Sequence, residues 1–214
     1  MTHTNHRQGT ITSLRGDWVV QMRRAKGIND QNASLKLKRF LELSLKYDPV
    51  GAGNSKVGNT LTIGWQKLMD GVGSIEDSHN AHIVFDSTDK VARFLKELVQ
   101  ADLGLSVIVS GLHDETDRLC REAGTRRHTV QYSLGVWGKT ELLPHPKILE
   151  ITTMCGHGTI PFNLVRRMSK AVRSKKLSLE QAAAELGKPC VCGVFNTSRA
   201  QALLQEYIAC TEDE

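Results

Sequence analysis

The chain has 214 residues, of which 40% are hydrophobic, 24% are charged and 5% are aromatic, and its formal net charge is +5. These are ordinary values for a soluble globular protein with a buried core, and the length fits one large domain or two small ones. Because aromatic residues are scarce, the core must rest on Leu, Val, Ile and Ala, which suits an α/β protein better than an all-β sandwich. The positive charge is compatible with nucleic acid or an anionic small molecule and demands neither.

Two features of the sequence concern membranes and secretion. No stretch of 18 uncharged apolar residues exists, so we expect no transmembrane helix. The chain begins MTHTNHRQGT, which is polar and lacks the apolar run of a secretory signal. We therefore expect a cytoplasmic protein with no membrane partner.

The first 80 residues carry weak secondary-structure signals. A polar lead is followed by DWVVQMRRAKG, which we interpret as a helix, and by SLKLKRFLELSLKY, a clearer helix whose leucines recur at helical spacing. TLTIGW alternates weakly and is expected to be a short strand. Loops are expected at residues 49–59, which are rich in glycine, and at residues 69–80.

The middle of the chain has the clearest pattern. Strands are expected in AHIVF, LSVIVSG and HTVQYSL, and helices between them in STDKVARFLKELVQAD and LHDETDRLCREAG. Strands that alternate with helices at this spacing predict right-handed β-α-β crossovers and a small parallel or mixed sheet. In chain order these elements occupy residues 81–85, 87–102, 105–111, 112–124 and 128–134.

The pattern becomes helical from Pro144 onward. A short helix is expected near PHPKILEITTM, a longer one from Pro161, and two more over residues 179–186 and 198–209. The spacing of Ser178 and Gln181 is that of a capping box. We therefore divide the chain into an α/β domain over residues 1–143 and a helical, cysteine-containing domain over residues 144–214.

Three of the five cysteines fall in two short glycine-flanked turns of the second domain. MCGHG contains Cys155 and His157, and PCVCG contains Cys190 and Cys192. In a reducing compartment, clustered cysteines indicate metal ligands or reactive thiols. The N-terminus of the following helix is expected to lower the pKa of the Cys155 thiol.

These cysteines could hold one of two metal groups. Three cysteines leave one iron of a [4Fe–4S] cluster without a cysteine, and that iron could bind His157 or act on a substrate as a Lewis acid. Alternatively, a Zn²⁺ ion could bind three cysteines and the histidine in a closed structural site. The C-x-C and C-x-H spacings match neither the usual zinc pairs nor the bacterial ferredoxin run. Without a metal, the same cysteines would be buried small side chains or a reactive thiol pair.

Four further residues are candidates for binding a substrate. Asn54 and Lys56 lie in the glycine-rich segment, which could form a small anion-binding turn but lacks the phosphate-loop order. Ser110 ends a predicted strand, where ligands bind in open α/β sheets, and Lys139 follows the last predicted strand. The alternative for each is ordinary turn or surface chemistry.

We expect an enzyme or enzyme subunit that acts on a small polar or anionic metabolite. A [4Fe–4S] cluster would serve as Lewis acid in a lyase, dehydratase or desulfuration reaction, and His157 would be the fourth ligand or a general acid–base. A partner subunit or a second copy of the chain could supply a missing ligand.

Two alternatives stay open. The basic helix near residues 164–176 and the segment SLEQAAAELGK resemble part of a helix-turn-helix, so the protein could be a metal-sensing regulator that binds nucleic acid. Its reading helix would have to be residues 198–208, where Arg199 is the sole cation. The other alternative is an assembly subunit in which zinc ties helices together.

Overall fold

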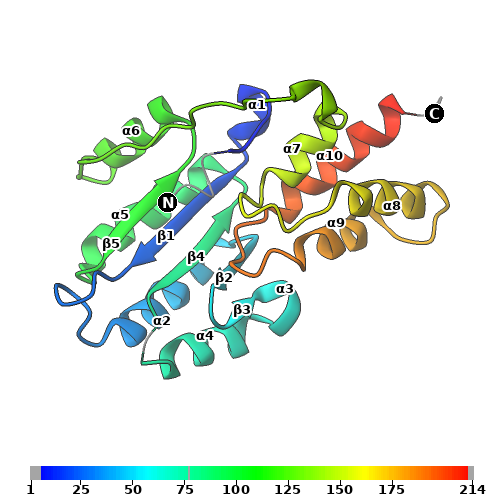
Figure 1. Cartoon of the computed structure of the whole chain (residues 1–214). Coiled ribbons are helices and arrows are strands. Elements are labelled where there is room, and N and C mark those ends of the chain that lie inside the picture. The colour runs from blue at the N-terminus through cyan, green and yellow to red at the C-terminus, as the bar shows by residue number, and fades with distance from the viewer. Residues whose placement is uncertain (1–5, 77, 212–214) are drawn as a thin grey trace.

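A computed structural model describes residues 6–76 and 78–211 and shows a mixed α/β fold (Figure 1). Five strands form an open sheet in the order β3-β2-β4-β1-β5, and each adjacent pair is antiparallel. The strands are β1 (Trp18–Arg23), β2 (Gly51–Asn54), β3 (Gly58–Asn59), β4 (Asn80–Phe85) and β5 (Ser106–Ser110).

The prediction of a parallel or mixed sheet is wrong because of one misread strand. DWVVQMR, predicted as a helix, contains β1, which lies between β4 and β5 and runs antiparallel to both. Trp18 and Val20 face one side of the sheet and Val19 faces the other, so both faces of β1 are buried. A short apolar run buried on both faces cannot be distinguished from a buried helix by periodicity alone.

The strand order gives two interleaved β-α-β units. β4 and β5 run parallel to each other across β1, and helix α5 (Thr88–Ala101) connects them. In the same way β1 and β2 are parallel across β4, and helix α2 (Ala33–Ser44) joins them. The predicted crossovers therefore exist, but each is split by an antiparallel strand, as in the ferredoxin-like topology. This topology carries many unrelated functions and assigns none by itself.

The strongly periodic segments form the elements that the sequence predicts, and the weakly patterned ones do not. β4, α5, β5, α2 and α6 (His113–Glu122) confirm the predictions for those segments. The predicted loop over residues 49–59 is instead the β2–β3 hairpin. The predicted strand and loop over residues 60–80 are mostly α3 (Thr60–Ile63) and α4 (Trp65–Ser74).

The two faces of the sheet belong to two different cores. One face packs against α2, α4 and α5 through aliphatic and aromatic side chains, including Phe40, Phe85 and Phe94. The other face contributes Val19 and Val84 to a second core that contains Cys155, Cys190 and Cys192. The sheet is thus the middle layer between two groups of helices.

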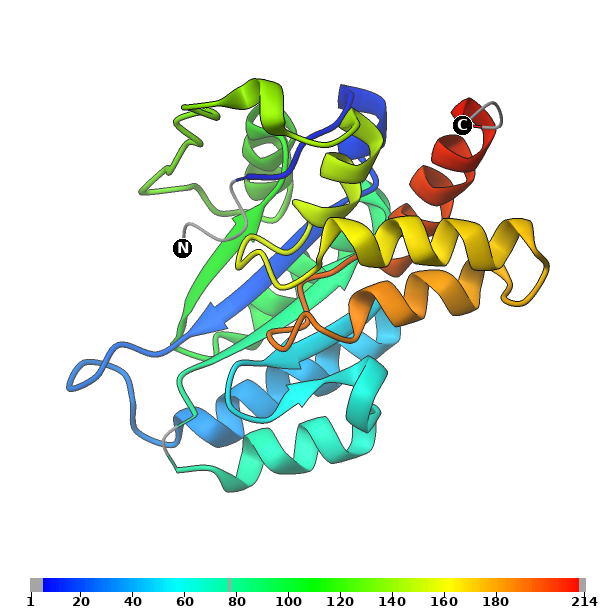
Figure 2. The ribbon, with the colours of Figure 1, turned by 45° about the vertical axis from the view of Figure 1, so that its right-hand side comes forward.

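The C-terminal helices cover the second face, and Figure 2 shows them in front of β1 and β4. Four helices were expected from Pro144 onward and four are observed. A capping box between Ser178 and Gln181 begins the third of them. The helices are α7 (Pro146–Thr152), α8 (Phe162–Arg173), α9 (Leu179–Gly187) and α10 (Thr197–Cys210).

The segment between α6 and α7 differs from its prediction. Residues 128–134 were predicted as a strand, but they form no strand, and residues 124–143 are all exposed. The remaining short elements of the described chain are α1 (Ile11–Leu14), η1 (Leu45–Tyr47) and η2 (Thr140–Leu142). Among the described residues no helix is both long and apolar enough to cross a membrane.

Candidate metal centre

The two cysteine turns meet on the second face of the sheet. Cys155 lies in the turn between α7 and α8, and Cys190 and Cys192 lie in the turn between α9 and α10. All three side chains are buried, with 2%, 0% and 4% of their surface exposed, whereas His157 is exposed. The centre is therefore sealed on the cysteine side and open on the histidine side.

The four side chains form a row. The thiol of Cys155 interacts with that of Cys190, whose Sγ lies 3.9 Å from Sγ of Cys192. Cys192 Sγ in turn lies 3.6 Å from Nδ1 of His157. Residues separated by 35 positions in the sequence are thus brought within contact distance.

The pKa values of the thiols reflect this row. The contact with Cys190 and then burial raise the pKa of Cys155 well above its ordinary value. The contact with Cys155 lowers the pKa of Cys190. The contact with Cys192 and burial outweigh this effect and raise the pKa of Cys190 to about 12. The pKa of Cys192 is lowered, chiefly because its thiolate accepts a hydrogen bond from Cys190.

The expected lowering of the Cys155 pKa by the helix that follows is therefore wrong. The Cys190 thiol and burial are the main causes of the raised pKa of Cys155. The Cys155 thiol also lies 2.9 Å from the hydroxyl of Thr159, which favours the thiolate but does not outweigh the other effects.

The row is not yet a closed set of metal ligands. Among the described residues, no group of three or more His, Cys, Asp and Glu side chains is gathered as the ligands of a single ion. The contacts join Cys155 to Cys190, Cys190 to Cys192, and Cys192 to His157, so the side chains would have to adjust before one ion could bind all four groups. Rotation about the Cα–Cβ bonds and movement of the exposed His157 are the available adjustments.

Glycines let the Cys192 turn press against the sheet. Gly193 has φ of +71°, and a Cβ there would lie 2.5 Å from the carbonyl carbon and oxygen of Ala52. A Cβ on Gly53 would lie 2.5 Å from the carbonyl oxygen of Cys192. The glycine-rich segment, predicted as a loop that could form a small anion-binding turn, therefore contains a strand on which the cysteine turn rests.

Asn59 fixes the same turn from the side. Its buried Nδ2 donates to the carbonyl oxygens of Lys188, at 3.2 Å, and of Cys190, at 2.9 Å. The sequence analysis did not single out Asn59, because its partners lie about 130 positions away and no local motif marks it.

Arg7 links the two cysteine turns. Its guanidinium donates to the carbonyl oxygen of Met154, at 3.2 Å, and to that of Val194. These carbonyls lie immediately before Cys155 and shortly after Cys192. The Arg7 side chain is 7% exposed, so this link is itself buried. The sequence analysis treated this region as a loose polar lead and missed it.

A buried ion-pair network holds Arg7 in place. Asp17 accepts from Arg7 and, at 2.8 Å, from Nη1 of Arg199, which is 5% exposed. Nδ2 of Asn196 donates to the same carboxylate at 3.2 Å. The start of β1, the start of α10 and both cysteine turns are thereby tied together.

The predicted substrate-binding residues lie elsewhere. Asn54 is fully buried, and its Oδ1 accepts from the backbone N–H groups of Lys56 and Val57 while its Nδ2 donates to Ser78 at 3.0 Å. Asn54 therefore organises the β2–β3 turn. Lys56 is exposed on that turn.

Ser110 and Lys139 also lie outside the row of cysteines. Ser110 is the last residue of β5 and is paired with Val19 in the sheet. Lys139 is exposed in the segment before α7. Their roles in binding a substrate, like those of Asn54 and Lys56, stay predictions.

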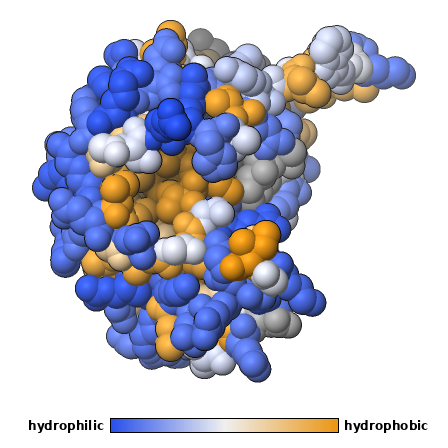
Figure 3. Space-filling view, turned by 90° about the vertical axis from the view of Figure 1, so that its left-hand side faces the viewer, coloured by the Kyte–Doolittle hydropathy of each residue, from blue (hydrophilic) through white to orange (hydrophobic). Residues whose placement is uncertain are grey.

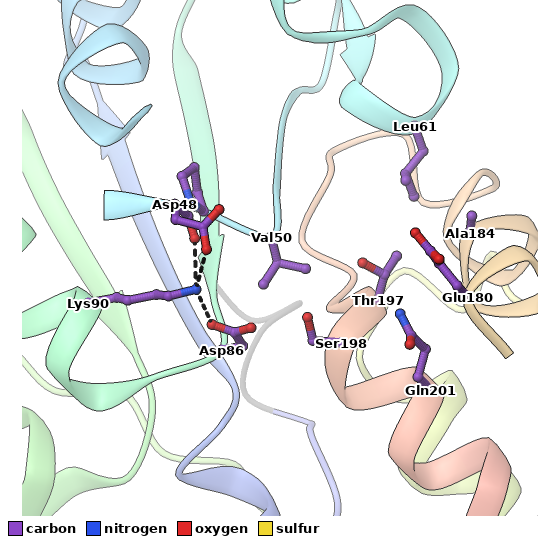
Figure 4. A pocket seen from close by; sticks show the side chains of 11 residues that line it. Asp48, Val50, Leu61, Asp86, Lys90, Glu180, Ala184, Thr197, Ser198 and Gln201 are labelled. Atoms are coloured by element: carbon purple, nitrogen blue, oxygen red, sulfur yellow. Dashed lines mark hydrogen bonds and ion pairs between the residues drawn. The ribbon is translucent and has the colours of Figure 1, made fainter. Parts of the chain in front are cut away.

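A cleft of about 290 Å³ lies where the two halves of the chain meet (Figure 4). On one wall Lys90 Nζ lies 2.9 Å from a carboxylate oxygen of both Asp48 and Asp86. Thr197, Ser198 and Gln201 of α10 form the opposite wall. A smaller cavity shares Thr197 with this cleft and reaches Gly193, next to Cys192.

Comparisons with protein-family models, with curated proteins and with solved structures found no match for this chain.

Proposed function

We propose that the protein is an enzyme, or the catalytic subunit of one, that acts on a small polar or anionic metabolite through a metal centre on Cys155, Cys190 and Cys192. The observation that carries the proposal is the meeting of three buried sulfur atoms from two distant turns beside an exposed imidazole. A purely structural zinc site needs no open side. Here the histidine side faces solvent, as a catalytic centre requires.

The first candidate for the bound group is the [4Fe–4S] cluster. With three cysteine ligands, one iron would be left for His157 or for the substrate, and it would polarise a hydroxyl, carbonyl or sulfur leaving group as a Lewis acid. The backbone N–H of Thr159 interacts with the Cys155 sulfur, and that of Val194 with the Cys190 and Cys192 sulfur atoms, as N–H groups do around cluster sulfur. His157 would donate or accept the proton of the reaction.

A single tetrahedral ion is the second candidate, and one distance favours it. Two thiolates on one zinc ion, each with a bond of about 2.3 Å, lie about 3.8 Å apart. The Cys190 and Cys192 sulfur atoms are 3.9 Å apart. In a cluster, by contrast, each cysteine binds a different iron, so the sulfur atoms must spread. His157 could then be the fourth ligand or could leave that position to water.

Anaerobic purification followed by metal and sulfide analysis tests the proposal. A brown protein with nearly equal iron and sulfide would support the cluster, and a colourless protein with one zinc would support the single ion. Cys190→Ser should abolish either signal, because Cys190 is in the middle of the row. Cys210→Ser is the matched control, since Cys210 is exposed at the end of α10. Wild-type protein without metal, or Cys190→Ser with full metal content, would refute the proposal.

The regulator alternative receives less support from the arrangement of α10. Arg199, the sole cation of that helix, is buried against Asp17 and does not point outward. Arg166, Arg167 and Lys170 of α8 are exposed and keep a basic surface available. Specific duplex binding that weakens steeply with salt would favour the regulator over the enzyme.

A further inference from the structure

The exposed segment 124–143 is unusual for its hydrophobic content. Twenty consecutive residues are exposed. The large hydrophobic side chains among them are Val130 (40% exposed), Tyr132 (61%), Leu134 (84%), Val136 (54%), Trp137 (83%), Leu142 (75%) and Leu143 (39%). Exposed apolar groups gathered in this way mark interaction surfaces more often than free surface.

Part of this segment has the pattern of a strand without a strand partner. Val130, Tyr132, Leu134 and Val136 recur at every second position, so in extended conformation they would project from one face. In the described chain these residues belong to no sheet. The ring of Tyr132 packs on His113 at 4.2 Å, and Arg127 forms an ion pair with Asp117 at 2.7 Å. Surface contacts of this kind are worth little and can be exchanged.

The same chain has an open strand edge. β5 is the last strand of the sheet on its side, and β1 pairs with one of its two edges. Its sequence SVIVS is strongly strand-forming, yet Val107 is 40% exposed. The opposite edge strand, β3, has two residues and offers little to pair with. An exposed apolar edge of this length is a template for a further strand.

We infer that β5 of one copy of this chain pairs with residues 129–136 of a second copy, and the reverse, in a two-fold dimer. Both halves of the interface are present on one chain, so a second copy is the partner that the chain itself specifies. Reciprocal pairing satisfies the open edge of both copies and closes the assembly. Gly124, with φ of +78°, lies between α6 and the exchanged segment and allows the segment to turn away from its own α6.

Figure 3 shows the face on which this exchange would occur, with an apolar hollow surrounded by hydrophilic side chains. A polar rim around an apolar centre is the usual composition of a protein interface. The dimer does not depend on the metal centre, so it can be tested on protein with or without metal.

Light scattering coupled to size-exclusion chromatography, run from about 1 to 100 µM protein, tests the dimer. The wild type is expected to be dimeric. Val107→Lys places a charge on the edge strand, and Tyr132→Glu with Leu134→Glu places charges on the exchanged segment. Each should raise the dimer dissociation constant by at least about tenfold. Ile28→Glu is the control, because Ile28 is 84% exposed outside both regions and should leave the dimer intact.

Mixing the two defective variants gives the sharper result. Val107→Lys retains an unchanged segment 129–136, and Tyr132→Glu with Leu134→Glu retains an unchanged β5 edge. The mixture should therefore form a heterodimer through one intact strand pairing. Amide hydrogen exchange should show protection of residues 106–110 and 129–136 in the wild-type dimer and loss of it in both variants. A monomeric wild type, a mixture that stays monomeric, or a dimer that Tyr132→Glu with Leu134→Glu does not weaken would overturn the inference. A monomer with both segments protected would mean pairing within one chain instead.

Discussion

The two faces of the sheet carry different kinds of buried side chains. On one face, Phe94 packs its ring against Phe40, Tyr47 and Phe85 at centroid distances of 5.6, 5.9 and 5.3 Å. The other face, beside Val19 and Val84, carries three thiols and a buried network of arginines and carboxylates. The aromatic and aliphatic side chains of the first face are those expected where burial serves stability alone. The second retains groups that are costly to bury, and such exceptions concentrate at functional sites.

A buried glutamine sharpens the contrast. Gln21 of β1 is 1% exposed and lies on the second face, between Val19 and Arg23 along the strand. Its Oε1 and Nε2 have no hydrogen-bond partner among the described residues. Across the sheet it is paired with His82, which is paired in turn with Gly53, the residue beneath the Cys192 turn. These three paired positions therefore cross the sheet from β1 toward the Cys192 turn.

The largest expected effect belongs to the apolar face. Phe94→Ala removes the ring that three other aromatic rings contact, so it should lower the free energy of unfolding by about 3–5 kcal/mol. Denaturant titration measures the loss, and metal content should be unchanged in protein that remains folded. A loss below about 1 kcal/mol would contradict the view that this face is the main folding core.

The next prediction distinguishes the close contact between Gly193 and β2 from the backbone strain of a positive φ. Gly193→Ala and Gly124→Ala both place a side chain at positive φ, which costs about 1–2 kcal/mol. At Gly193 the new Cβ also meets Ala52, which adds about 1–3 kcal/mol of overpacking, whereas no atom lies within 4 Å of a Cβ at Gly124. Unfolding and metal binding should both suffer more in Gly193→Ala. Equal losses would show that the contact between Gly193 and β2 contributes nothing.

Arg7→Met tests the link between the two cysteine turns. It leaves the Met154 and Val194 carbonyls without the guanidinium donor and Asp17 with Arg199 and Asn196 as donors, at a cost of about 1–3 kcal/mol. Metal affinity, measured by competition with a chelator, should fall as well. Arg166→Met is the control, because the exposed Arg166 bonds to Asn163 within its own helix. If both variants bind metal equally well, Arg7 does not position the turns.

Gln21→Met should raise the stability of the protein, whereas the variants above should lower it. Replacing a buried amide that lacks partners by an apolar side chain of similar length should stabilise the metal-free protein by about 1 kcal/mol. Thermal unfolding measures the change, with Gln205→Met on the exposed surface of α10 as the control. A loss of stability would show that the amide of Gln21 has a partner and that the second face is packed like the first.

The smallest effect concerns the cleft between the two halves. Burial lowers the pKa of Lys90, but hydrogen bonds and charges of Asp48 and Asp86 outweigh it, so the pKa lies above the ordinary 10.5. A raised pKa stabilises the fold below pH 10.5 and ceases to do so as the pH rises above it. Lys90→Met should therefore cost less than about 1 kcal/mol near pH 7. The difference from wild type should shrink above pH 10.5; a constant difference would assign the loss to packing.

The sequence pattern correctly predicted the helices and strands whose hydrophobic residues recur with clear periodicity. The segment 87–102 repeats its apolar residues at helical spacing and is a helix, and the run over residues 81–85 is a strand. β1 could not be recognised because both its faces are buried, so it lacks the alternation of a half-buried strand, and without it the sheet order could not be derived. The antiparallel arrangement depends on that one insertion.

The candidate site was predictable in part. Cysteines in short glycine-flanked turns marked Cys155, Cys190 and Cys192, and the fold does bring these residues together. Arg7, Asn59 and Gln21 could not be found in this way. Each acts through partners more than 50 positions away, or through position on the sheet, and none belongs to a local motif.

The Arg7 contacts have a consequence for the order of events during synthesis. Arg7 is translated before its acceptors at Met154 and Val194, which follow 147 and 187 positions later. The sheet and its aromatic core can form while the ribosome is still translating, because all their residues precede Pro144. The cysteine turns therefore gain the Arg7 contacts only after Val194 has emerged. A metal ion bound by these turns would thus meet a sheet that can already have folded.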